Sequence, residues 1–141
     1  MQTIVFKNER GFVSLCNPAP GLDIEYVMQK DVPAGCDAVI MDMDSLPHDD
    51  NDFYDAWILV NGKIEVDLPE AREITKKRLR VERLDCFSKL DVAFMRSLEL
   101  GQSTAEIVAE KQRLRDITNL ADQETTLSGL RALKAELQIT L

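Results

Sequence analysis

The longest unbroken pattern in the chain predicts a helix over residues 69–99. Pro69 suits the first helical position, because the backbone N–H that proline lacks has no helical partner there. Glycine and proline are then absent until Gly101, so nothing in the composition stops the helix earlier. A helix of about 31 residues is roughly 46 Å long. It is therefore much longer than the dozen or so residues that are usual in a small globular domain.

The two halves of this helix differ in their hydrophobic pattern. Ten of the sixteen residues from 70 to 85 are charged. Further on, apolar residues recur every three or four positions, and this spacing predicts a stripe that faces a core. The stripe consists of Leu84, Phe87, Leu90, Phe94 and Leu98. We therefore expect the second half to pack against its own chain and the first half to be mostly solvated.

Three other apolar residues, Ile74, Val81 and Met95, fall on a different face of the same helix. A long helix with such a thin apolar seam is typical of one that packs against a partner helix. The alternative is a solvated helix held by ion pairs four residues apart, such as Glu73–Lys77. We favour the partner, because such ion pairs stabilise a helix only slightly.

The N-terminal part reads as short β-strands separated by turn-forming residues. Strands are expected at residues 2–6, 12–16, 24–28 and 37–44, followed by a loop at 45–52. Asn61-Gly62 lies between "AWILV" and "KIEVD" and predicts a type I′ hairpin, since both residues can adopt positive φ. The expected result is one small antiparallel sheet of five or six strands.

The C-terminal part reads as two shorter helices. Gly101 suits a left-handed helix end, and Ser103 with Glu106 forms a capping-box pattern that would start a helix at about 104–117. A third helix is expected at about 127–137. Leu120 and this third helix should close a core against the long helix. The predicted fold class is α+β, with a small antiparallel β unit at 1–68 followed by a helical region at 69–141.

Composition and charge agree with that division. The chain of 141 residues is 45% apolar and 30% charged, as in globular proteins, and no apolar run approaches the length of a membrane span. No secretory leader is visible at the N-terminus. The net charge of −8 divides into −9 for residues 1–68 and +1 for 69–141. The long helix carries a basic run of Lys76, Lys77, Arg78, Arg80 and Arg83. Acidic residues are interleaved with it, which favours a solvated helix over nucleic-acid binding.

The pattern gives no sign of catalytic chemistry. His48, the only histidine, lies in an acidic loop, but Pro47 and Phe53 occupy positions where a calcium-binding EF-hand counted from Asp42 needs Gly and Glu. Motifs for nucleophilic catalysis or phosphate binding are absent from the sequence. We expect no enzyme, no cofactor, no metal site and no small-molecule substrate. Three cysteines without C-x-x-C spacing predict free thiols, with a Cys16–Cys36 pair as an alternative; the third is Cys86.

The residues that we expect to contact other proteins are those of the thin seam, one arginine of the same helix and one aromatic residue. Tryptophan beside a hairpin is typical of a core or an interface anchor. The expected interface residues are Ile74, Arg78, Val81, Met95 and Trp57.

Four segments of the chain resemble a family of small tail proteins of tailed bacteriophages. They are "DVPAG" at 31–35, "FYDAWILVNGKIEVDLPEAREI" at 53–74, "KKRLRVER" at 76–83 and "LDVAFMRSLELGQSTAEIVAEKQRLRDIT" at 90–118. The last one resembles the family pattern "LDV.(F/Y)MR.LE.G" followed by "I...KQ.LRD". The resemblance extends over roughly residues 31–134.

The resemblance implies a non-enzymatic structural protein of the virion. Such a protein would be made in the host cytoplasm and would act as an adaptor in the tail, the baseplate or the tail-fibre attachment region. Its partners would be other phage tail proteins and copies of itself, with neither nucleic acid nor membrane involved. The alternative is a tail-fibre assembly chaperone that is absent from the mature particle.

Overall fold

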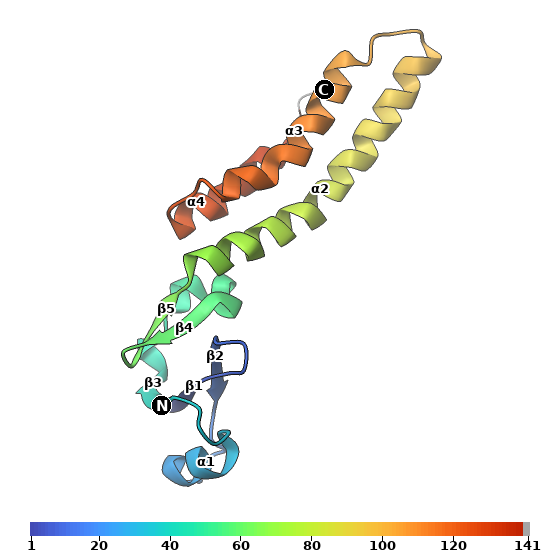
Figure 1. Cartoon of the computed structure of the whole chain (residues 1–141). Coiled ribbons are helices and arrows are strands. Elements are labelled where there is room, and N and C mark those ends of the chain that lie inside the picture. The colour runs from blue at the N-terminus through green and yellow to red at the C-terminus, as the bar shows by residue number, and fades with distance from the viewer. Residues whose placement is uncertain (140–141) are drawn as a thin grey trace. The chain divides into compact units, whose positions relative to one another are not determined.

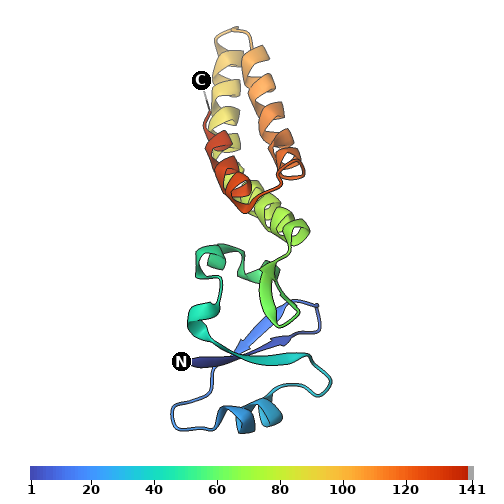
Figure 2. The same ribbon diagram turned by 90° about the vertical axis from the view of Figure 1, so that its left-hand side faces the viewer.

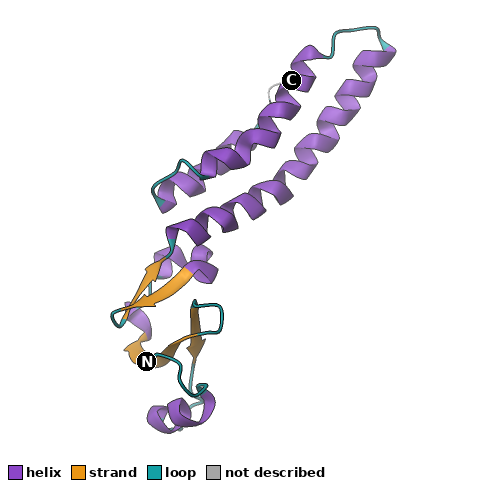
Figure 3. Ribbon diagram, viewed as in Figure 1, coloured by secondary structure: helices purple, strands orange, loops and turns teal. Residues whose placement is uncertain are grey.

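The computed structural model describes residues 1–139 and shows an α+β protein, with small antiparallel sheets, a long helix and shorter C-terminal helices. The chain forms two compact units, Met1–Glu70 and Ala71–Leu141. All the strands within residues 1–139 belong to the first unit, and the regular structure of the second unit is helical (Figure 3).

Within residues 1–139 the strands form two separate antiparallel sheets, so the prediction of a single sheet is wrong. In the first sheet, β1 (Gln2–Lys7) lies between β2 (Val13–Cys16) and β3 (Ala38–Asp42). The second is a hairpin of β4 (Trp57–Val60) and β5 (Lys63–Val66). Figure 2 shows both ladders. Two 3₁₀ segments, η1 (Met43–Ser45) and η2 (His48–Ala56), connect them.

The strand expected at 24–28 is instead the helix α1 (Ile24–Asp31), which is a further correction. Its buried and half-buried residues, Ile24, Val27 and Met28, recur at the spacing of one helix face. The β-branched and aromatic residues of "IEYVM" suggested a strand, but this spacing outweighs them. The helix ends at Asp31, and its C-cap Val32 is extended, because a residue that precedes proline, here Pro33, is disfavoured in the helical region.

The hairpin turn confirms the type I′ prediction, because Asn61 and Gly62 have φ of 50° and 76°. Val60 pairs with Lys63, which leaves a loop of two residues. Gly62→Ala should therefore lower the free energy of unfolding of the first unit by about 1 kcal/mol, because a Cβ is disfavoured at positive φ. The exposed neighbour Lys63→Ala is the control. Urea titration followed by Trp57 fluorescence measures both, and equal effects would contradict the prediction.

The second unit consists of α2 (Leu68–Glu99), α3 (Ala105–Ala121), α4 (Leu127–Ala132) and a 3₁₀ turn, η3 (Leu133–Leu137). The helices α2 and α3 run antiparallel and are joined by a short connection (Figure 1). Gly101 has a φ of 65°, and the N–H groups of Gly101 and Gln102 bond to the carbonyls of Leu98 and Ser97. This Schellman motif confirms the predicted end of the long helix.

The predicted capping box at the start of α3 is wrong. The N-cap is Thr104, and the hydroxyl of Ser103 accepts a hydrogen bond of 3.3 Å from the N–H of Ala105. The Schellman motif places Gln102 against α2, and α3 begins one residue later than the capping box requires. The helix also continues to Ala121, four residues beyond the expected end.

The core of the second unit contains part of the predicted stripe. Leu90, Ile107 and Leu114 are buried, and Phe87 and Phe94 pack against them. Leu84 and Leu98, which we expected in this core, are exposed, and so is Leu120. For the two residues of α2 the reason is helical geometry. Leu84 lies six residues before the buried Leu90 and Leu98 lies eight after it, so their side chains point about 120° and 80° away from that of Leu90.

Candidate functional site

The side of α2 that faces α3 binds its neighbours through polar groups as well as through the core. Arg83 donates from Nη1 to the carbonyls of Leu114 and Arg115, at 3.0 and 3.1 Å. Arg72 donates from Nε and Nη2 to the carbonyl of Glu124, at 3.0 and 2.7 Å. The interpretation of the basic run as merely solvated is therefore wrong at Arg83.

Ion pairs extend this inner face at both ends. Lys76 Nζ lies 2.6 Å from a carboxylate oxygen of Asp122 and 2.9 Å from one of Glu73. These acids raise the pKa of Lys76, chiefly because the ammonium group donates hydrogen bonds to Asp122 and then to Glu73. Glu73 thus pairs with Lys76, where the sequence suggested Lys77. Near the other end, Lys111 Nζ lies 2.5 Å from Asp91.

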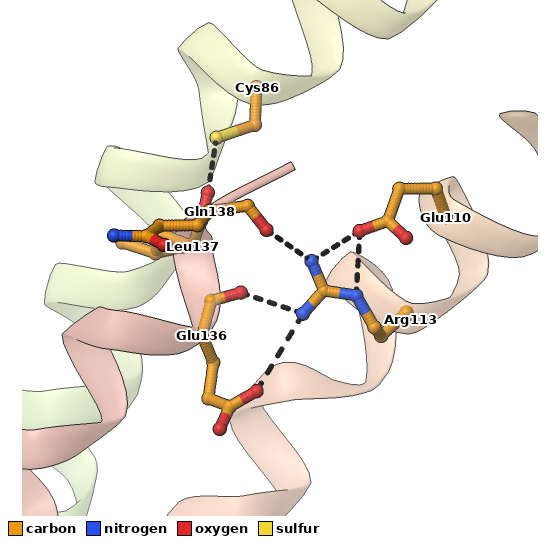
Figure 4. Close-up of polar contacts among 6 residues, drawn as sticks. All are labelled: Cys86, Glu110, Arg113, Glu136, Leu137 and Gln138. Atoms are coloured by element: carbon orange, nitrogen blue, oxygen red, sulfur yellow. Dashed lines mark hydrogen bonds and ion pairs between the residues drawn. The ribbon is translucent and has the colours of Figure 1, made fainter. Parts of the chain in front are cut away.

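Arg113 of α3 ties the last described residues to the helical pair (Figure 4). Its Nη1 and Nη2 donate to the carbonyls of Glu136 and Gln138, at 2.7 and 2.9 Å, and the guanidinium also binds the carboxylate of Glu110. The bond to Glu110 is the main cause of a raised pKa of Arg113. From α2, the thiol of Cys86 donates to the carbonyl of Leu137 at 3.2 Å. The C-terminal turn is therefore held from both helices.

Arg113→Met should destabilise the second unit by about 1–2 kcal/mol, because the methionine keeps the aliphatic packing and loses every hydrogen bond of the guanidinium. Arg96→Met, on an exposed residue near the end of α2, is the control and should change stability by about 0.5 kcal/mol or less. Urea unfolding followed by circular dichroism compares them. Equal stability of the two variants would show that the Arg113 bonds contribute nothing net.

The opposite side of α2 is apolar and exposed. Its members are four apolar residues with a serine at the centre, which we call the outer face: Val81, Leu84, Ser88, Val92 and Met95. The exposed fractions of the four apolar side chains are 68%, 63%, 52% and 56% in that order, whereas Leu90 on the inner side is 0% exposed. At 3.6 residues per turn the five positions fall within an arc of about 80°. Beside Val81, a shallow hollow is lined by Lys77, Arg78, Val81 and Glu82.

Exposed apolar residues gathered on one side of a helix are typical of a protein–protein interaction site. Of the interface residues expected from sequence, Val81 and Met95 lie on it. Arg78 lines the hollow beside Val81, and Ile74 is half-buried about two helical turns before Val81. From the sequence we did not place Leu84 and Val92 on this face, and we expected Leu84 in the core. Each lies three residues from Val81 or Met95, and this helical spacing indicates a shared face.

Trp57 is buried, so the expectation that it contacts a partner is wrong. Its side chain is 1% exposed in the core of the first unit, with Val5, Val13 and Leu46. The indole Nε1–H donates to the carbonyl of Asp50 at 3.2 Å, and the ring of Tyr54 lies 5.0 Å away.

The acidic loop and the three thiols are the other positions that the sequence analysis considered for chemistry. His48 Nε2 lies 2.7 Å from the carbonyl of Met43, and residues 1–139 contain no group of three or more side chains placed to hold a metal ion. Cys16, Cys36 and Cys86 are free thiols, so the alternative Cys16–Cys36 pair is not formed. A hollow at the N-terminus is lined mainly by Met1 and residues 18–24.

Comparison of the chain with protein-family models, with curated proteins and with solved structures found no match. None of the described helices is both long and apolar enough to span a membrane.

Proposed function

We propose that this chain is a non-enzymatic structural protein of a bacteriophage tail, which joins other tail components through exposed surfaces. The observation that carries the proposal is the outer face of α2, an apolar strip that the chain's own core leaves uncovered. Burying such a strip against a partner is favourable, at about 25 cal/mol for each Å² of apolar surface.

Two further features support an adaptor. The sequence resembles small tail proteins over roughly residues 31–134, which include all of α2 and α3. The inner face of α2 is fastened to the rest of its unit by charged hydrogen bonds and ion pairs, so the outer face belongs to an ordered helix. An ordered surface binds with a smaller loss of conformational entropy than a flexible one. On this proposal the partners are other tail proteins and copies of the same chain, and the protein is made in the host cytoplasm and resides in the virion.

Mass spectrometry of purified and extensively washed particles, from the phage whose genome encodes the chain, tests the proposal. We expect the protein at a fixed copy number relative to the known tail components. Abundance in infected cells combined with absence from the particles would overturn the structural role. That outcome would favour the alternative, a tail-fibre assembly chaperone, and a pull-down of the fibre protein with this chain would then be the next measurement.

A further inference from the structure

The outer face of α2 has a spacing that reads the same in both directions. From Val81 the next members follow at intervals of three, four, four and three residues, with Ser88 at the centre. Val81 and Met95 are each seven residues from Ser88, and Leu84 and Val92 are each four residues away. Because an antiparallel copy of a helix presents its residues in reverse order, this face is complementary to itself.

Antiparallel pairing about Ser88 brings different apolar residues together on both sides of the central serine. Val81 of one copy would lie opposite Met95 of the other, and Leu84 opposite Val92. Ser88, the smallest residue of the face, would meet its own copy where the helices approach most closely. The flexible side chain of Met95 would reach the hollow beside Val81, and methionine adapts well to such irregular gaps.

The charged residues at the two ends of the strip are also placed symmetrically about Ser88. Lys77 and Glu99 are exposed, each eleven residues from Ser88 on opposite sides, so antiparallel pairing brings them together at both ends. Nearer the centre, Asp85 and Lys89 form an ion pair of 2.8 Å within one chain. In the pair of helices, Lys89 of each copy would also lie within reach of Asp85 of the other. A parallel arrangement would instead place Lys77 against Lys77 and Glu99 against Glu99.

We propose that two copies of this chain associate through the outer faces of α2, with the helices antiparallel about a twofold axis at Ser88. Such an interface is isologous, because the same patch serves both copies. The contact from Lys77 to Glu99 would be about 33 Å long and one helix wide, which is small for a protein interface. We therefore expect a reversible dimer with a dissociation constant in about the micromolar range.

Sedimentation velocity of the full chain over a range of concentrations tests for the dimer. Leu84→Asp should raise the dissociation constant by about tenfold or more, since it places a charge at the centre of the contact. Val108→Asp changes an equally apolar, exposed residue on α3 and should leave it unchanged. Circular dichroism checks that both variants fold. A monomer at all concentrations, or equal effects of the two variants, would overturn the proposal.

Charge exchange tests the direction of the pairing. Lys77→Glu and Glu99→Lys should each weaken the dimer by about fivefold at low salt, because each places like charges together at both ends. The double variant Lys77→Glu/Glu99→Lys restores opposite charges and should recover the original affinity. In a parallel dimer neither single change creates a new repulsion, and the double variant would not act as a rescue.

Disulfide trapping tests the register. In a background of Cys16→Ser, Cys36→Ser and Cys86→Ala, oxidation of Ser88→Cys should link two copies, because a disulfide needs Cα atoms about 4.4–6.8 Å apart. Lys77→Cys alone should remain unlinked and should link only when mixed with Glu99→Cys. Self-linking of Lys77→Cys would show a parallel dimer and overturn the proposal. The dimer and the presence of the protein in virions are measured separately, so either result can fail without the other.

Discussion

Leu90→Ala should lower the free energy of unfolding of the second unit by about 3–5 kcal/mol, the largest change expected from one substitution in that unit. Leu90 is fully buried, in contact with a core that includes Ile107 and Leu114. Its removal forfeits the burial of the side chain and leaves a cavity between α2 and α3 that close-packed neighbours fill only in part. Urea unfolding followed by far-UV circular dichroism measures the change, since α2 and α3 account for most of the helical signal.

The matched control is Leu84→Ala, the same substitution on the same helix about 120° away. At concentrations where the protein is monomeric, it should change stability by about 0.5 kcal/mol or less, because Leu84 is exposed. At higher concentrations it should instead weaken the proposed dimer. A large loss of stability from Leu84→Ala in the monomer would contradict the assignment of this residue to the outer face.

Trp57→Ala should destabilise the first unit by about 3–5 kcal/mol. The indole fills the centre of a small core and donates a hydrogen bond to the carbonyl of Asp50, and this hydrogen bond is lost when the ring is removed. Units of this size bury little surface in total, so a single large side chain is a major share of their stability. Hydrogen exchange of the β1 amides, followed by mass spectrometry, measures the loss without relying on tryptophan fluorescence.

Two variants show whether the indole itself is responsible. Trp57→Phe keeps an aromatic ring and loses the hydrogen bond, and it should cost less than Trp57→Ala. Tyr26→Ala removes an exposed aromatic ring from α1 of the same unit and should have little effect on exchange. Faster exchange in Tyr26→Ala than in Trp57→Ala would contradict the placement of the core.

The two faces of α2 differ in what they contribute: the inner face stabilises the unit, and the outer face is the one proposed for association. Charged residues such as Arg72 and Arg83 are usually a solvated surface, but here they bond to backbone carbonyls of the neighbouring segments. The apolar residues that a core normally takes are partly left outside, at Val81, Leu84, Val92 and Met95. Polar contacts on the inner side therefore contribute to holding the unit together and leave the opposite apolar strip available for a second copy.

The features that the sequence determined are those governed by local chemistry. The long helix α2 begins at Leu68, next to Pro69, and ends at Glu99. It ends there because Gly101 takes the left-handed backbone conformation of the Schellman motif, which only glycine adopts readily. The hairpin at Asn61-Gly62 follows from the same preference for positive φ. The α+β class follows from strand-like alternation before residue 68 and helical spacing after it.

Tertiary structure decided what depends on neighbours distant in sequence. "IEYVM" has β-branched and aromatic residues, yet it forms α1, where Val27 is buried. The apolar stripe of α2 contains more leucines than α3 can cover, so the position of α3 selects Leu90 for the core and leaves Leu84 exposed. Trp57 could have faced either way on its strand, and packing against Val5 and Leu46 placed it inside. Periodicity identifies the faces of an element, but which face is buried depends on what the rest of the chain brings against it.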